Sequence, residues 1–141
     1  MDENQIGKEV VDAAVKIHRA PGPGLLESVY EAILAKDLFS RGLQVQRQAP
    51  APIEYEGIRF EERFRADLVV KERVILELKS VEHLSKTHFR QWLTHLKLKR
   101  LRLGFLLNFN AALMKDGIAR VINGLEDEKP GFLGFGGEKN K

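Results

Sequence analysis

Three charged residues in otherwise apolar stretches have the types and the spacing that phosphate chemistry requires. Asp67 and Glu77 lie in two successive apolar runs separated by a polar break at residues 71–73, and Lys79 follows Glu77 by two positions. Strand side chains alternate between faces, so Glu77 and Lys79 should share one face, roughly 6–7 Å apart. The short break permits a hairpin, which would bring Asp67 beside them.

Two carboxylates beside a lysine predict a divalent-cation site with a positive charge next to a phosphate. Burying such charges without partners costs several kcal/mol, so a compensating cation is expected. Oxygen ligands favour Mg²⁺ or Mn²⁺ over zinc. A structural alternative stays open, in which Asp67 and Glu77 form a buried ion pair with Lys79 or Arg65.

The order Asp67, nine residues, then Glu77-Leu78-Lys79 resembles the PD-(D/E)XK nuclease superfamily. The upstream segment 24–30, Gly-Leu-Leu-Glu-Ser-Val-Tyr, resembles the signature of the GxxExxY family, a branch of that superfamily. Further similarity at 15–19, 55–57, 104–109 and 115–118 extends the resemblance over about residues 6–122.

This resemblance implies an α/β fold of the restriction-endonuclease type, with a mixed β-sheet flanked by helices. It also implies an endonuclease-like hydrolase that cleaves phosphodiester bonds of nucleic acid, DNA or RNA. The implied catalytic residues are Glu27, Asp67, Glu77, Lys79 and Gln91, and the implied metal ligands are Glu27, Asp67, Glu77 and the carbonyl of Leu78. The alternative is a non-catalytic nucleic-acid-binding or assembly module, since folds are shared by proteins that bind without cutting.

The elements that must position these residues are read from periodicity and turn signals. They are helices at about 4–19, 25–40 and 86–99, and strands at 43–48, 51–56, 58–64, 65–70, 74–79, 103–109 and 117–122. The two acidic strands should lie at the centre of the sheet. Pro21–Gly24 separates the first two helices as a turn.

Helical spacing places Glu27 within an apolar arc of the second helix, which consists of Leu26, Tyr30, Ile33, Leu34 and Leu38. Glu27 could instead be a first-turn glutamate favoured by the helix dipole. Tyr30 either hydrogen-bonds a carboxylate of the site or a phosphate of bound nucleic acid, or packs in the core.

Further along the chain, Gln91 and His95 should flank the site from the third helix, whose core face is Phe89, Trp92, Leu93 and Leu96. His95 stands where a related branch of the superfamily has tyrosine. A zinc site from His83, His88 and His95 is disfavoured without cysteines or closer pairing. His18 could be catalytic, packed or exposed.

A dense basic run, consisting of Lys97, Lys99, Arg100 and Arg102, follows the third helix core. Such a run is usually a solvated face, but beside a metal site it would contact the phosphates of a nucleic acid.

The 141 residues are 43% hydrophobic and 30% charged, which is typical of one globular domain, expected at 1–123 with a flexible tail at 124–141. The net charge of +3 is modest, so nucleic-acid affinity must come from local clustering. No apolar run reaches the ~20 residues that span a bilayer, no signal peptide is recognisable, and cysteine is absent, so we expect a cytoplasmic protein without a membrane partner. The oligomeric state stays open, a homo-oligomer included.

Overall fold

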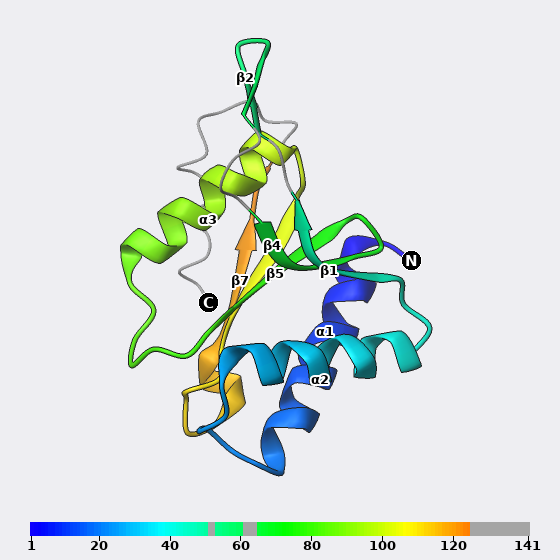
Figure 1. Cartoon of the computed structure of the whole chain (residues 1–141), viewed down its shortest axis with the longest axis vertical. Coiled ribbons are helices and arrows are strands. Elements are labelled where there is room, and N and C mark those ends of the chain that lie inside the picture. The colour runs from blue at the N-terminus through cyan, green and yellow to red at the C-terminus, as the bar shows by residue number, and fades with distance from the viewer. Residues whose placement is uncertain (51–52, 61–64, 125–141) are drawn as a thin grey trace.

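A five-stranded mixed sheet forms the centre of the molecule (Figure 1). The computed structural model describes residues 1–50, 53–60 and 65–124. The sheet strands, in spatial order, are β1 (Val45–Pro50), β4 (Arg65–Val70), β5 (Val74–Lys79), β6 (Leu103–Asn108) and β7 (Ile118–Ile122). β5 and β6 run parallel and the other neighbours run antiparallel, so the sheet is mixed as predicted.

Three helices cover the two faces of this sheet (Figure 1). They are α1 (Glu3–Arg19), α2 (Glu27–Ser40) and α3 (Lys86–Lys99), and a short 3₁₀ helix, η1 (Met114–Gly117), precedes β7. The helices α1 and α2 lie on one side and α3 on the other. The predicted α/β class with flanking helices is confirmed. None of the described helices is both long enough and apolar enough to cross a membrane.

Each face of the sheet has its own apolar cluster because strand side chains alternate. Leu68, Leu76 and Phe105 point toward α1 and α2, and they pack with Val10 and Leu34 of those helices. On the opposite face, the predicted core positions of α3 pack on the sheet; they are Trp92, Leu93 and Leu96, with Phe89 partly buried. The apolar residues of β4 and β5 therefore pack against α1 and α2 on one face of the sheet and against α3 on the other.

The hairpin β2 (Ile53–Tyr55) and β3 (Ile58–Phe60) is a separate two-stranded ribbon. Its turn is Glu56-Gly57, and both residues have positive φ, at 52° and 79°. The predicted strands 51–56 and 58–64 are therefore observed in part, and residues 51–52 and 61–64 lie outside the described part of the chain. The predicted tail, from residue 125 onward, also lies outside it.

The buried face of α2 differs from the predicted arc. Tyr30, Leu34 and Leu38 are buried as expected, but Leu26 is 73% and Ile33 is 39% exposed. The buried arc instead includes Glu31 and Ala35, because α2 packs against α1 on one side and against β1, β4 and β5 on another. Because the buried face differs from the predicted one, a second carboxylate of α2, that of Glu31, lies toward the sheet.

Candidate active site

The central feature of the site is a point where β4 and β5 separate. Their antiparallel pairing ends at Leu68 and Leu76, and Asp67 and Glu77 are the next residues on the two strands. Asp67 Oδ2 accepts a 2.8 Å hydrogen bond from the backbone N–H of Leu78. A carboxylate therefore takes the place of a backbone acceptor, which fixes Asp67 beside β5.

Glu77 carries the most perturbed carboxylate of the site. Its Oε2 lies 3.5 Å from Lys79 Nζ, and its Oε1 is buried with no hydrogen-bond partner in the described part of the chain. Burial, and next the negative charge of Asp67, raise the pKa of Glu77 to about 7, while Lys79 opposes the rise. Glu77 is therefore partly protonated at neutral pH in the protein without a bound cation.

Asp67 also titrates above its ordinary range. Burial is the largest cause of its raised pKa, and the charge of Glu31 adds to it, whereas hydrogen bonds from Leu78 N–H and the Gln48 side chain lower it. The negative charge of Asp67 thus disfavours ionisation of Glu77 and raises its pKa. A nearby cation would relieve this repulsion and lower both pKa values.

A polar network connects Asp67 to α2. Gln48 Nε2 donates to Asp67 Oδ1 at 3.2 Å and to Glu31 Oε1 at 2.8 Å. Arg47 Nε donates to Glu31 Oε2 at 3.1 Å, and the Glu31 side chain is only 8% exposed. Sequence reasoning missed this network, although Glu31 follows Glu27 by four residues and therefore shares its side of the helix.

Glu27 lies at the margin of this site. It is the first residue of α2 and is exposed, and its charge contributes to the raised pKa of Glu77. Among the described residues, however, no group of three or more His, Cys, Asp or Glu side chains is close enough to hold a metal ion. The predicted ligand set of Glu27, Asp67 and Glu77 is therefore not assembled in this conformation.

The helix α3 forms the other wall of the site. Gln91, His95 and Trp92 line a small hollow together with Glu77 and Lys79. Burial lowers the pKa of His95 to about 4, so its imidazole is neutral at physiological pH. Its ring stands edge-on to Trp92, with centroids 6.0 Å apart. Gln91 is an exposed member of this lining.

Comparison with known proteins agrees with this geometry. A family model described as the PD-(D/E)XK nuclease superfamily matches residues 4–121. The chain belongs to this superfamily. Separate searches of curated proteins and of solved structures gave no match. The matched range includes Asp67, Glu77 and Lys79, the residues on which the resemblance in the sequence rests, and these residues lie where β4 and β5 separate.

Divalent metals serve PD-(D/E)XK nucleases in general, and the residues present fit such an ion. The negative charge of Asp67 raises the pKa of the Glu77 carboxylate, so the two groups repel each other when both are ionised. The buried Glu77 Oε1 lacks a hydrogen-bond partner in the described part of the chain. Mg²⁺ commonly binds through one or two carboxylates and keeps water and substrate phosphate as its other ligands. Asp67 and Glu77 therefore suit an ion completed by substrate better than a closed protein cage.

Tyr30 has a structural position rather than a place on the binding surface. Its side chain is fully buried, its hydroxyl donates to the Gly22 carbonyl, and the Leu25 N–H donates to its oxygen at 3.3 Å. Its ring stacks on Phe109 at a centroid distance of 4.4 Å. The predicted contact of Tyr30 with nucleic acid is thus wrong for this conformation, and the core alternative holds. Tyr30 instead fixes the turn that leads to Glu27.

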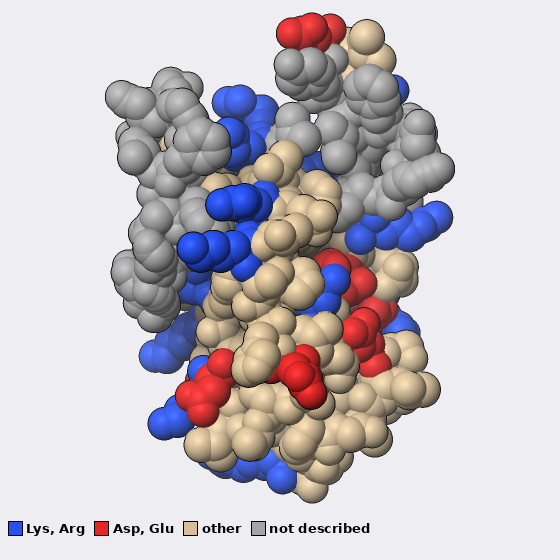
Figure 2. All heavy atoms as spheres, turned by 90° about the vertical axis from the view of Figure 1, so that its left-hand side faces the viewer, with Lys and Arg blue, Asp and Glu red and all other residues tan. Residues whose placement is uncertain are grey.

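The basic run lies at the far end of α3 from the loop that follows Lys79. Lys97, Arg100 and Arg102 are exposed, whereas Lys99 is partly buried. Burial, and next the charge of Arg59, lower the pKa of Lys99, so Arg59 of β3 lies near it. We call these five residues the basic cluster. On the face in Figure 2, many Lys and Arg side chains lie in the upper half and most acidic ones in the middle and below, although an acidic group also lies at the top and basic groups at the lower edge.

The raised pKa of Glu77 predicts a pH-dependent loss of stability. Because its folded pKa of about 7 exceeds the ordinary 4.5, the folded protein binds a proton more readily, and stability falls as pH rises through this window. We expect Glu77→Gln to raise the free energy of unfolding by about 1–3 kcal/mol at pH 8.5 and to change it little at pH 4. Urea unfolding in EDTA measures this difference.

The matched control is Glu82→Gln, since Glu82 is exposed in the loop after β5. It should leave stability nearly unchanged at both pH values. An effect of Glu77→Gln that is the same at pH 4 and pH 8.5 would contradict the electrostatic interpretation.

Proposed function

We propose that this protein is a Mg²⁺- or Mn²⁺-dependent nuclease that hydrolyses phosphodiester bonds of DNA or RNA. The observation that carries the proposal is the meeting of Asp67, Glu77 and Lys79 where β4 and β5 separate, in a chain of a nuclease superfamily. Burying charged groups at a break in a sheet costs folding free energy, and a bound ligand can compensate that cost.

In this proposal Asp67 and Glu77 would hold the cation, and the resemblance adds the Leu78 carbonyl and Glu27, which is exposed at the margin of the site, as further ligands. A bound Mg²⁺ supplies Lewis-acid chemistry and lowers the pKa of water. The protein groups do the rest. The Leu78 N–H orients Asp67, and Gln91 binds the substrate at the mouth of the hollow.

Lys79 has a separate role. Its ammonium group is held 3.5 Å from Glu77 Oε2, on the wall of the hollow that Gln91 also lines. There it stabilises the negative charge that develops on the phosphate or orients the attacking water. A positive charge fixed in advance needs no reorganisation during the reaction, which is why this role belongs to the transition state.

The basic cluster would bind the phosphate backbone. We expect the combined replacement by glutamine of its four members in the last turn of α3 and just after it, Lys97→Gln, Lys99→Gln, Arg100→Gln and Arg102→Gln, to weaken nucleic-acid binding and flatten its salt dependence. Each lost contact should reduce the slope of log affinity against log salt by about 0.9 on duplex DNA and about 0.7 on single strands. Fluorescence anisotropy at several salt concentrations measures the slope.

A control variant, Lys8→Gln with Lys36→Gln, removes exposed charges of α1 and α2 and should leave the slope nearly unchanged. Metal binding should not respond to the cluster variant, since exposed charges beyond roughly 8–10 Å are mostly screened. An unaltered slope in the cluster variant would mean that the substrate enters elsewhere.

A non-catalytic nucleic-acid-binding module is the second candidate. Both oxygens of Asp67 already accept hydrogen bonds from the protein, and no three-residue metal group is assembled among the described residues. A site of this kind can persist after turnover is lost. This candidate predicts binding to nucleic acid that never leads to a cut.

The deciding experiment is incubation of the purified protein with single- and double-stranded DNA and RNA, in Mg²⁺, Mn²⁺ or EDTA. Cleavage that requires the cation and disappears in EDTA supports the nuclease. Tight binding without cleavage in either cation supports the binding module.

Three finer assignments belong to the same proposal. We place the chain in the GxxExxY branch because Gly24, Glu27 and Tyr30 match its signature, and the bonds of Tyr30 give that spacing a physical reason. A cytoplasmic location agrees with a nucleic-acid substrate and with the absence of cysteine. Light scattering in solution decides whether the protein acts as a monomer or a homo-oligomer.

A further inference from the structure

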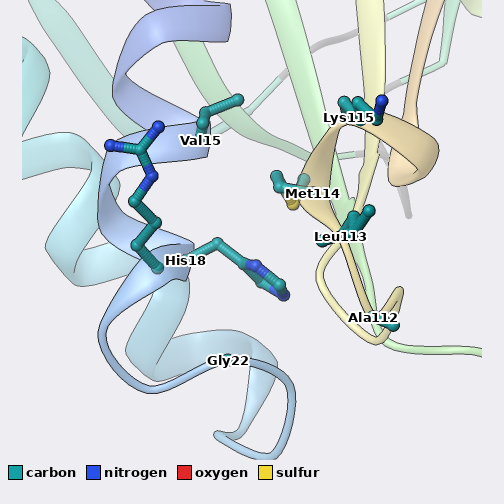
Figure 3. Close-up of a pocket in the computed structure, with 8 residues that line it drawn as sticks. Val15, His18, Gly22, Ala112, Leu113, Met114 and Lys115 are labelled. Carbon is teal, nitrogen blue, oxygen red and sulfur yellow. The ribbon is translucent and has the colours of Figure 1, made fainter.

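A second concave site lies at the end of α1, on the side of η1 (Figure 3). The cavity has a volume of about 340 Å³ and lies between the last turns of α1 and the segment Ala112–Lys115. None of its lining residues lines the hollow at Glu77 and Lys79. We call it the α1–η1 pocket. Its size falls within the range of small-molecule sites, roughly 300–1,000 Å³.

A buried histidine marks the floor of this pocket. His18 is only 4% exposed, and its Nε2 is buried with no hydrogen-bond partner in the described part of the chain. Its imidazole extends from α1 toward the Ala112–Met114 segment (Figure 3). One side of the ring is near Phe109, at a centroid distance of 6.2 Å. Buried polar atoms nearly always have partners, so this nitrogen implies a group that the protein does not supply.

The remaining walls define what that group would be attached to. Val15, Leu113 and Met114 are apolar, and Leu113 is 58% exposed at the edge. Arg19 and Lys115 also line the pocket, and neither makes an ion pair with another described residue. None of the described residues that line the pocket is acidic. An apolar surface with only basic polar groups suits an anion that carries a hydrocarbon or aromatic body.

We propose that the α1–η1 pocket binds a small organic anion, a phosphate or carboxylate group on an apolar or aromatic body. The anionic oxygens accept hydrogen bonds from His18 Nε2–H and from the flexible side chains of Lys115 and Arg19. The body of the ligand packs on Val15, Leu113 and Met114. This site is independent of the proposed nuclease chemistry, because it uses neither the cation nor the carboxylates of β4 and β5.

The probes that test this proposal are phenyl phosphate and benzoate, compared with phenol and inorganic phosphate, in EDTA and without nucleic acid. We expect phenyl phosphate, benzoate or both to bind at least about tenfold more tightly than phenol, because an anion forms a charge-assisted hydrogen bond with the basic side chains of the pocket. Inorganic phosphate should bind at least about tenfold more weakly than phenyl phosphate, because it lacks the apolar body. Phenyl phosphate and benzoate distinguish the two anionic groups.

Calorimetry measures the affinities, and ¹⁵N spectra of the histidine rings locate the ligand. The His18 ring signals should shift, whereas those of the exposed His83 should not. Lys115→Gln should weaken binding of the anion by about tenfold without changing the affinity for phenol. Lys8→Gln, a matched loss of charge on the exposed side of α1, should change neither affinity. His18→Phe retains a ring against Phe109 and should abolish the preference for the anion.

Four results would overturn the proposal. They are equal affinity for phenol and for both anions, no binding of any probe, shifts at other histidines only, and a response of His18 to nucleic-acid strands alone. Lys115 is exposed, so Lys115→Gln and the ring signals of the wild type decide the question even if His18→Phe fails to fold.

Discussion

Lys79→Ala should reduce phosphodiester cleavage by about 10²–10³-fold, while the fold stays intact and metal affinity is largely retained. The reason is that its ammonium group acts on charge that develops only in the transition state. Lys79 is partly exposed at the end of β5, so truncation leaves no large cavity. Single-turnover cleavage rates at saturating protein concentration measure the effect directly.

The metal measurement for this variant belongs at pH 8.5. Removal of Lys79 takes away a charge that lowers the pKa of Glu77, so at neutral pH the variant would lose metal affinity indirectly. The matched control is Lys86→Ala, at the start of α3, which should cleave like the wild type. Equal losses of metal affinity and of rate at pH 8.5 would show that Lys79 holds Glu77 in place and has no role in the transition state.

Asp67→Asn should abolish both cation binding and cleavage, with a loss of rate of about 10³-fold or more. Several kcal/mol of charge stabilisation depend on an anionic ligand at this position, and 1.4 kcal/mol corresponds to a factor of ten. The substitution is nearly isosteric, and an amide oxygen still accepts from the Leu78 N–H that now bonds to Oδ2. The fold should therefore survive.

Two measurements distinguish this prediction from simple destabilisation. Urea unfolding in EDTA should show that Asp67→Asn has a stability close to that of the wild type, because removal of a carboxylate whose pKa burial raises offsets the loss of the hydrogen bond that Gln48 Nε2 donates to Oδ1. Asp116→Asn, in the exposed part of η1, serves as a control for the loss of one carboxylate. Wild-type cleavage by Asp67→Asn would remove Asp67 from the site.

Local patterns in the sequence predicted much of this fold. The turn at residues 71–73 and the period-two alternation predicted the β4–β5 hairpin, and the structure places Glu77 and Lys79 on one face. Helix ends were predictable where caps are local, as at Ser85, whose side chain accepts from His88 N–H. These features depend on residues close in sequence, so single-chain reasoning reaches them.

Tertiary packing decided the parts that sequence reasoning missed. The buried face of α2 depends on how α2 lies against α1 and β1, which turns Glu31 inward and leaves Leu26 exposed. Gln48 bridges two carboxylates from a backbone with φ of 49°, a conformation that its residue type does not suggest. Tyr30 binds a turn eight residues earlier, and only the folded chain shows that partner.

The most direct test of the central claim is a Mn²⁺ titration followed by ¹H–¹⁵N NMR, without nucleic acid and at pH 8.5. Paramagnetic broadening depends on distance to the ion, so it locates the cation whatever the substrate. We predict that the amides of Asp67, Glu77, Leu78 and Lys79 broaden first, and that Asp67→Asn abolishes this pattern. First broadening at other carboxylates, or the same pattern in Asp67→Asn, would contradict it.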